Sequence, residues 1–157
     1  MSIIEKYRLG VDPGLGGAVV LLVDNTPIEW MRMPTLTVGK SRRVDAAALR
    51  EFLSDYDDVG HAYVELVHAM PGQGVASMYA FGHACGAVEG VLAALHIPIT
   101  LVRPQGWKKA AGLIGTDKDA ARSRAIQLWP SWSELGKKGE GQALADAALI
   151  ALFGDLA

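Results

Sequence analysis

The sequence predicts a single α/β domain over residues 1–157, and three observations favour this class. Short β-rich runs at 7–12, 18–24 and 27–34 are separated by tight turns, which is typical of an antiparallel meander. Helical stretches then alternate with further β-rich runs. The 157 residues, 50% of them hydrophobic, suit one core and are too few for a two-domain enzyme.

The middle of the chain predicts two helix-strand units after the meander. Residues 45–56 have apolar side chains at helical spacing, with Asp45 as the N-cap, and 61–67 return to a strand. A long segment rich in Gly and Ala, 74–95, predicts a helix that packs closely against the sheet or another subunit, and 97–104 predict the last strand.

Two helices are expected in the last third of the chain. Thr116 and Asp119 have the spacing of a capping box at the start of a helix that stops at Pro130. After a polar loop, the apolar run ALADAALIALF (143–153) predicts a terminal helix. The expected order is three strands, helix, strand, helix, strand, helix, helix.

Charge and cysteine content restrict the function classes. The chain has 15 basic and 17 acidic residues, and a net charge of −2 by itself argues weakly against a nucleic-acid partner. The single Cys85 excludes an internal disulfide, and no apolar run is long enough to span a membrane. With no basic, apolar leader, we expect a cytoplasmic protein. The basic residues nevertheless form local groups: Lys40, Arg42 and Arg43; Lys108 and Lys109; Lys118, Arg122 and Arg124; Lys137 and Lys138.

Three acids interrupt apolar elements: Asp12 at the end of the first strand, Glu65 in YVELV, and Asp146 in the terminal helix. A buried carboxylate without a partner costs several kcal/mol, so three such positions indicate a shared partner. Magnesium or manganese prefers oxygen ligands of this kind, and two such ions can act on both oxygens of a cleaved phosphodiester. The alternatives are that Asp12 starts a turn, Glu65 lies on an exposed edge and Asp146 faces solvent.

Four stretches together resemble the RuvC-type Holliday junction resolvases, especially their compact phage and bacterial members. They cover nearly the whole chain: GVDPGLGGAVVLL, YVELVHAMPGQGVASMYAFGHACGAVEG, RPQGWKKAAGLIGTDKDAARSRAIQLWP and ADAALIALFG. The resemblance implies the RNase H-like fold, a mixed five-stranded sheet with helices on both faces. It also implies a homodimer that makes paired nicks in a four-way DNA junction, in a bacterial or phage-infected bacterial cell.

The resemblance further implies that Asp12, Glu65 and Asp146 are catalytic and ligate Mg²⁺, or Mn²⁺ as a substitute, with two ions per active site. One departure concerns the fourth ligand. The family has an acid or a histidine about one helical turn before the last aspartate, where this chain has Ala143. Glu140 could supply that ligand, the site could work with three carboxylates, or the ligand could have been lost; the sequence leaves these open.

Several other residues are expected to contact branched DNA. His68, Met70 and Gln73 lie in a Pro/Gly loop after the Glu65 strand, where an apolar tip could enter between bases. The alternative for the loop is that Met70 packs inward. The alternative for the basic residues is that they only form a solvated face. The expected phosphate contacts, the last two on another DNA arm, are Lys108, Lys109, Lys118, Arg122, Arg42 and Arg43.

The tryptophans and the small residues of segment 74–95 give two packing predictions. Trp107, Trp129 and Trp132 are expected in the core or at helix ends rather than as base-stacking platforms. The small residues of segment 74–95 would allow close approach of a second subunit. They are Gly82, Ala84, Gly86, Ala87 and Gly90.

Two other function classes fit parts of this sequence. Sugar kinases and actin-like ATPases also begin with a strand, an aspartate and a Gly-rich turn. They need two related domains, whereas these 157 residues have room for one, so length argues against that class. A non-catalytic module that binds branched DNA with the same fold is the second alternative, and the absent fourth ligand favours it.

Overall fold

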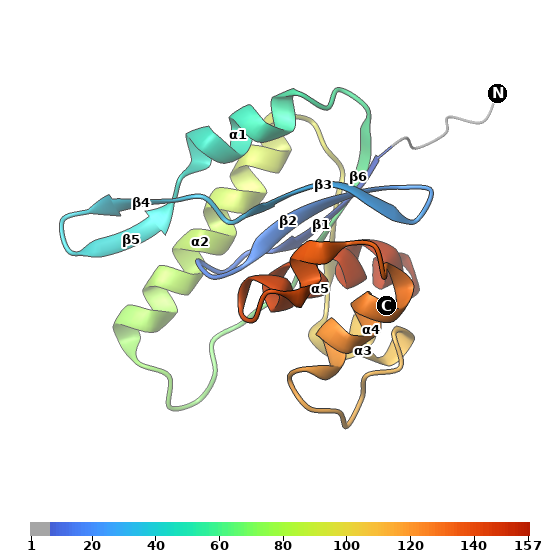
Figure 1. Ribbon diagram of the computed structural model, residues 1–157. Helices are drawn as coiled ribbons and strands as arrows, with labels where there is room; N and C mark the ends of the chain where they lie inside the picture. Colours follow the sequence, from blue (N-terminus) through green and yellow to red (C-terminus); the bar gives the residue numbers. More distant parts are fainter. Residues whose placement is uncertain (1–6) are drawn as a thin grey trace.

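The computed structural model describes residues 7–157, and its centre is a mixed sheet in the order β3-β2-β1-β6-β7 (Figure 1). The strands β3, β2 and β1 are antiparallel, and β6 and β7 continue from β1 in parallel. The predicted mixed five-stranded sheet is therefore confirmed. The strands are β1 (Tyr7–Asp12), β2 (Ala18–Val23), β3 (Thr26–Arg32), β6 (Val59–Glu65) and β7 (Ile99–Val102).

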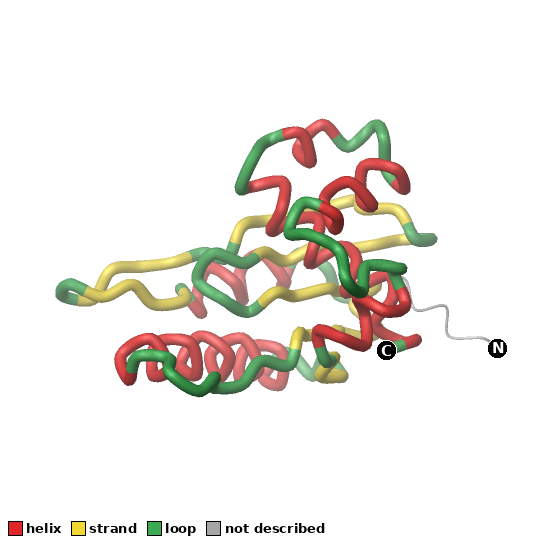
Figure 2. The backbone as a smooth tube through the Cα atoms, turned by 90° about the horizontal axis from the view of Figure 1, so that it is seen from below, coloured by secondary structure: helices red, strands yellow, loops and turns green. Residues whose placement is uncertain are grey.

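Helices cover both faces of the sheet, as predicted, because the central strands are apolar on both sides. Leu9 and Val19 face one helical layer, whereas Val20 and Leu22 face the other. The first layer is α1 (Ala46–Ser54) with α2 (Val75–Ala94), and the second contains α3 (Pro104–Ala110), α4 (Ala120–Leu128) and α5 (Glu140–Phe153). Figure 2 shows the two layers on opposite sides of the strands.

The terminal helix α5 lies against β1 and β2 with almost no exposed face. Gly10 in β1 allows this approach. A methyl group at residue 10 would overlap the carbonyl oxygen of Ala147 and come within 2.7 Å of the Ala151 side chain. The absence of a side chain at Gly10 therefore determines how closely α5 packs on the sheet.

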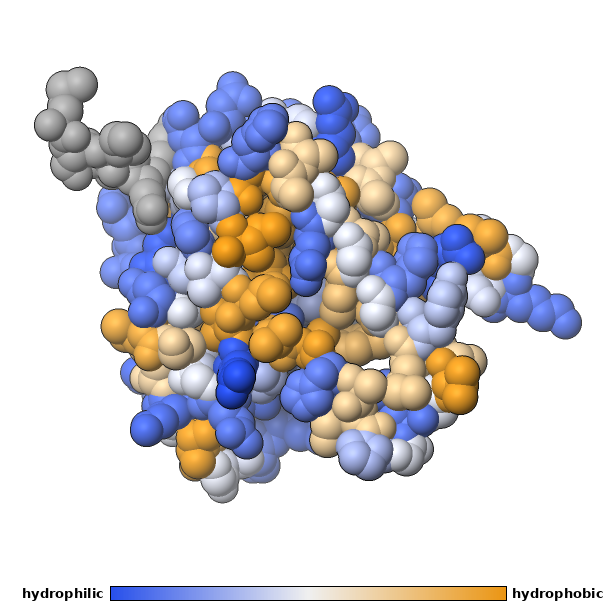
Figure 3. All heavy atoms as spheres, turned by 180° about the vertical axis from the view of Figure 1, so that it is seen from behind, coloured by the Kyte–Doolittle hydropathy of each residue, from blue (hydrophilic) through white to orange (hydrophobic). Residues whose placement is uncertain are grey.

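The outer face of α2 is apolar and exposed. Val75 is 82% exposed and Tyr79 is 67% exposed. Apolar side chains gather on the face seen from behind (Figure 3), which is the side of the sheet covered by α2.

Along residues 7–157, no helix is both long enough and apolar enough to span a membrane.

The sequence did not predict the second, two-stranded sheet formed by β4 (Thr35–Val38) and β5 (Ser41–Val44). Gly39, with φ of +62°, lies in the turn between the two strands, and the hairpin extends away from the rest of the molecule (Figure 1). It leads into α1, where Asp45 is the N-cap as predicted. Its side chain accepts a hydrogen bond from the Ala48 amide at 3.0 Å.

The predicted capping box at Thr116 is wrong. Helix α4 begins at Ala120, because Thr116 instead donates its hydroxyl to the Leu113 carbonyl and the Asp117 side chain accepts from the Asp119 amide. Local side-chain hydrogen bonds of this kind compete with helix formation. The strand predicted at 61–67 lies two residues earlier, as β6, and the strand predicted at 97–104 is shorter, as β7. Two 3₁₀ helices, η1 (Ser133–Gly136) and η2 (Gly154–Leu156), were not predicted.

The prediction that the tryptophans pack in the core is confirmed. Trp107 is 1% exposed, and Trp129 and Trp132 are each 8% exposed. Trp132 also contacts Trp30 of β3, with ring centroids 4.8 Å apart. These rings join α3, α4 and η1 to the face of the sheet that α5 covers.

The substitution Gly10→Ala tests the contact between β1 and α5. We expect a loss of about 2 kcal/mol in the free energy of unfolding, because the added methyl group forces α5 away from the sheet. Gly136→Ala is the matched control, since nothing lies within 4 Å of a methyl group at that position. Urea unfolding followed by circular dichroism measures both. Equal stability of the two variants would contradict the account of Gly10.

Candidate functional site

The three acids predicted from the sequence lie at one end of the sheet. Asp12 is the last residue of β1, and Glu65 is the last residue of the parallel neighbour β6. Val11 pairs with Val64 in the parallel ladder, so Asp12 and Glu65 follow side by side at the carboxyl ends of β1 and β6. Asp146 lies on α5 next to Ala147, whose carbonyl packs against Gly10 two residues before Asp12.

The pKa values show that the three carboxylates interact. Burial is the main cause that raises the pKa of Asp12, and it likewise raises the pKa of Glu65, which the charge of Asp12 raises further. The pKa of Asp146 rises from 3.8 to about 7, through burial first and then through the charges of Asp12 and Glu65. The three carboxylates are therefore largely withdrawn from water, and Asp146 lies close enough to Asp12 and Glu65 for their charges to act on it.

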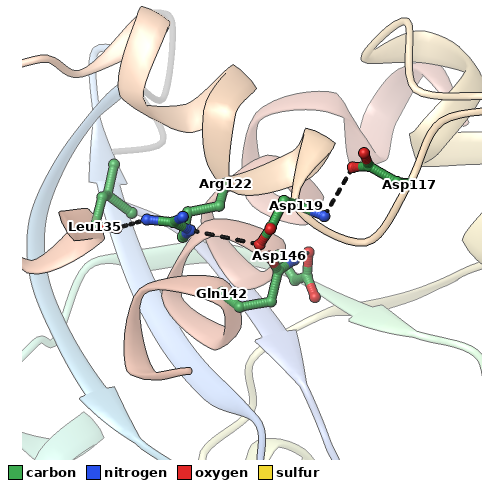
Figure 4. A network of polar contacts seen from close by, with 6 residues as sticks. All are labelled: Asp117, Asp119, Arg122, Leu135, Gln142 and Asp146. Atoms are coloured by element: carbon green, nitrogen blue, oxygen red, sulfur yellow. Dashed lines mark hydrogen bonds and ion pairs between the residues drawn. The ribbon is translucent and has the colours of Figure 1, made fainter. Parts of the chain in front are cut away.

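Each carboxylate has one protein hydrogen-bond donor that fixes one of its oxygens. The Gly14 amide donates to Asp12 Oδ1 at 3.3 Å, and the Trp107 indole Nε1 donates to Glu65 Oε1 at 3.0 Å. The third donor is the side-chain amide of Gln142, one helical turn before Asp146. Its Nε2 donates to Asp146 Oδ1 at 3.0 Å (Figure 4).

The donor set matches the chemistry of a hard divalent cation. The three carboxylates supply anionic oxygens in a region of raised pKa, and Gln142 Oε1 is a buried acceptor with no hydrogen-bond partner among residues 7–157. In the same described range, no three His, Cys, Asp or Glu side chains already form a group that could hold a metal ion. A bound cation would therefore have to draw the carboxylates closer together.

Two of the predicted basic residues border this site. A hollow beside Asp146 is lined by Lys108, Thr116, Lys118 and Gln142. The charge of Lys108 lowers the pKa values of all three carboxylates, although burial outweighs it at each, together with repulsion by other acids at Glu65 and Asp146. Asp117 also lines this hollow, so the two lysines stand among acidic groups on the surface beside the carboxylates.

Other predicted basic residues lie elsewhere. Lys109 borders a different hollow, together with Thr100 and Arg103. The guanidinium of Arg122 donates to the Leu135 carbonyl at 3.3 Å, which ties α4 to η1 (Figure 4). On the protruding hairpin, Arg42 donates to the Thr35 hydroxyl at 3.0 Å, and its neighbour Arg43 is half-buried.

The structure does not bring Glu140 to the carboxylates. It is the exposed first residue of α5 and lies six positions before Asp146, which places it roughly 120° away around the helix axis. Ala143, at the position where the family resemblance places a fourth acid, is 6% exposed and belongs to the core between α5 and the sheet.

The loop after β6 places its predicted DNA contacts at the surface. His68 is exposed, and Met70 is 59% exposed, so the alternative in which Met70 packs inward is wrong. Gln73 holds the loop, because its Oε1 accepts from the Met70 amide at 3.2 Å and its Nε2 donates to Ser77 at 3.2 Å. These loop residues line a shallow hollow together with Phe81 of α2.

Sequence reasoning missed three residues that contact or influence the acids. Arg32 lies in the same row of the sheet as Asp12, because Asp12 pairs with Ala18 and Ala18 pairs with Arg32. Its charge lowers the pKa of Asp12, and the register of the meander could have revealed it. The spacing of four residues between Gln142 and Asp146 was a second available signal, whereas nothing in the sequence indicated that Trp107 donates to Glu65.

The sheet order and the two helical layers are those of the RNase H-like fold. Within it, the solved structures similar to this chain include RuvC of T. thermophilus in complex with a Holliday junction substrate. The identity is 20%, with 96% of this chain and 93% of that chain covered and a TM-score of 0.70. A second Thermus thermophilus RuvC structure matches with 21% identity, the same coverage and a TM-score of 0.63. No protein-family model and no curated protein matches the sequence. The chain has a RuvC-like fold.

The raised pKa of Asp146 predicts a pH-dependent stability without metal. The unfolded chain releases this proton near pH 3.8 and the folded chain near pH 7, so the stabilisation by the neutral carboxyl is lost as pH rises through about 7. In EDTA at pH 8, we expect Asp146→Asn to be more stable than the parent by on the order of 2 kcal/mol, after allowance for solvent screening. Near pH 4, the two should unfold alike.

Urea unfolding at several pH values measures this difference, with Glu51→Gln, an exposed substitution on α1, as the matched control. A constant difference between Asp146→Asn and the parent from acid to neutral pH would contradict the raised pKa.

Proposed function

We propose that this protein is a metal-dependent endonuclease that cleaves four-way DNA junctions, in the cytoplasm of a bacterial or phage-infected cell. The observation that carries the proposal is the convergence of Asp12, Glu65 and Asp146, from β1, β6 and α5, at one edge of a RuvC-like fold. A neighbour with this fold was solved with a Holliday junction substrate, which supports branched DNA as the substrate class.

The proposed chemistry is hydrolysis of a phosphodiester bond. Asp12, Glu65 and Asp146 would hold Mg²⁺, or Mn²⁺ in its place, with two ions per site. A cation bound there supplies Lewis-acid activation of water and neutralises charge that develops on the phosphate oxygens. Trp107 orients Glu65 through its indole N–H, and Gly14 orients Asp12 through its amide. Lys108, beside the carboxylates, attracts the phosphate into the site.

The proposed DNA contacts extend from the carboxylates in two directions. Lys108 and Lys118 would bind phosphates at the rim of the hollow beside Asp146. The exposed Met70, at the tip of a loop stabilised by Gln73, would enter between bases at the crossover, with His68 beside it. Secondary phosphate contacts on other arms of the junction would come from Lys109, Arg122, Arg42 and Arg43.

We further propose that the protein acts as a homodimer, because paired nicks require two sites. Three of the small residues in α2, Gly82, Gly86 and Gly90, lie on its outer face, where open space surrounds each one. The apolar surface on that side (Figure 3) supports contact with a second copy of the helix. Ala84, in contrast, faces the core of its own chain, and Ala87 packs against the same core.

A non-catalytic junction-binding module is the second candidate. Two observations favour it: Ala143 is buried in the core where a fourth acid would be expected, and the described residues contain no ready-made metal cluster. The two candidates share the fold and the basic surface, and they differ only in whether the bound DNA is cut.

The substitutions Asp12→Asn, Glu65→Gln and Asp146→Asn separate these candidates. Each removes one negative charge and keeps the shape, so we expect each to lower Mg²⁺-dependent nicking of a synthetic four-way junction by at least about 100-fold. Junction binding in EDTA should persist or tighten, because repulsion of phosphate falls. Glu51→Gln on the exposed face of α1 is the control and should cut like the parent.

If the parent protein binds the junction but nicks it with neither Mg²⁺ nor Mn²⁺, the binding-module candidate replaces the nuclease. If the three variants nick at the parental rate, the assignment of the carboxylates is wrong.

The proposed phosphate contacts predict a change in the salt dependence of binding. The double variant Lys108→Ala/Lys118→Ala should reduce the slope of log K against log salt by roughly 1.8, because each lost contact removes about 0.9. Lys138→Ala, an exposed lysine away from the hollow, should leave the slope unchanged. Fluorescence anisotropy with a labelled junction in EDTA measures the slope, and a parental slope in the double variant would place these lysines outside the interface.

A further inference from the structure

The side chain of Gln142 lies against Asp146 with one half of its amide unused. Its Nε2 donates to Asp146 Oδ1 at 3.0 Å, from one turn earlier on α5 (Figure 4). Its Oε1 is buried and has no hydrogen-bond partner among residues 7–157. A buried acceptor without a partner costs about 1–3 kcal/mol, so this arrangement needs a further group to satisfy the oxygen.

The chemistry of the pair determines which way the amide faces. In the structure the amide nitrogen faces Asp146 and the amide oxygen has no partner; the ionised carboxylate, which is the form that binds a cation, would keep this orientation because it only accepts hydrogen bonds. Gln142 and Asp146 both line the hollow bordered by Lys108, Thr116 and Lys118. Lys108 does not satisfy the oxygen, and its ammonium lies over the Trp107 ring at 5.5 Å from the centroid.

A divalent cation would satisfy this oxygen. Side-chain amide oxygens are ordinary ligands of hard cations, alongside carboxylates. Asp12, Glu65 and Asp146 already repel one another, and a neutral ligand adds an oxygen without adding to that repulsion. The amide nitrogen can keep its hydrogen bond to Asp146 while the amide oxygen binds the cation. Gln142 would then both orient the ligand Asp146 and be a ligand itself.

The other candidates for a fourth ligand are less well placed. Ala143 has no donor atom and is packed in the core between α5 and the sheet. Glu140 is exposed on a different side of α5, at its first residue. Gln142 is the polar residue of this helix that contacts Asp146 directly.

We propose that Gln142 is the fourth oxygen ligand of the site, through Oε1, in place of the acid or histidine that Ala143 replaces. This inference rests on the proposed metal-dependent function. It deepens that function by assigning a mixed ligand set, with three carboxylates and one neutral amide, to the divalent cation.

The test is the affinity of the protein for Mn²⁺ without DNA, measured by electron paramagnetic resonance of the free ion. Gln142→Met keeps the length of the side chain and removes both polar atoms, and we expect it to weaken Mn²⁺ binding by at least about tenfold. Gln142→Glu supplies an anionic oxygen at the same place and should tighten binding at pH 8. Gln127→Met, on the exposed surface of α4, is the matched control and should bind like the parent.

The glutamate variant distinguishes a ligand from a residue that only orients Asp146. If Gln142 acted only through its Nε2 donor, glutamate would lose that donor and weaken Mn²⁺ binding, which would overturn the proposal. Parental affinity in Gln142→Met would overturn it as well. Thermal unfolding of each variant in EDTA confirms that the chain is folded during the measurement.

The outcomes also separate this inference from the proposed function. If the parent protein binds Mn²⁺ and nicks junctions, and Gln142→Met binds Mn²⁺ with the same affinity, the nuclease proposal stands and only the role of Gln142 is wrong. A parent protein that neither binds Mn²⁺ nor nicks overturns both.

Discussion

The close contact between β1 and α5 at Gly10 is the constraint on which the candidate site depends. Without a side chain at this position, the backbone of α5 packs directly on the strand that ends in Asp12. The parallel pairing of β1 with β6 then places Glu65 beside Asp12, and α5, packed on one face of the sheet, contributes Asp146. Three acids that are far apart in the sequence become neighbours through backbone packing rather than through their own side-chain contacts.

The fold gains nothing from this arrangement of charges. The pKa values of all three carboxylates are raised, mainly by burial, and the charges of neighbouring acids raise those of Glu65 and Asp146 further. At Asp12, the charges of Arg32 and Lys108 offset only part of the effect of burial, which acts against folding near neutral pH. Buried acids that cost stability are typical of functional sites, and here the missing compensation is positive charge. The proposed divalent cation would supply this positive charge, and the proposed Gln142 ligand would add an oxygen without adding negative charge.

The order of strands and helices was predicted from local patterns, which also singled out the three acids, whereas the mixed sheet with helices on both faces was implied by the resemblance to the RuvC-type resolvases. Strands buried on both faces are continuously apolar, and an acid in such a run is conspicuous even without a structure. The β4–β5 hairpin and the true start of α4 were not predicted, because both depend on local turn geometry around Gly39 and Asp117. The contacts of Trp107 and Gln142 with the acids depend on how α3 and α5 pack, which no local pattern reveals.

The most direct test of the account is anomalous X-ray diffraction from crystals of the parent protein grown with Mn²⁺. The account predicts one or two strong manganese peaks among the carboxylates of Asp12, Glu65 and Asp146, with Gln142 Oε1 within ligand distance of one of them. Glu65 should keep its hydrogen bond to Trp107 in that structure. A fully ordered site with no manganese peak at these three carboxylates, at a Mn²⁺ concentration that supports junction cleavage, would contradict the central claim.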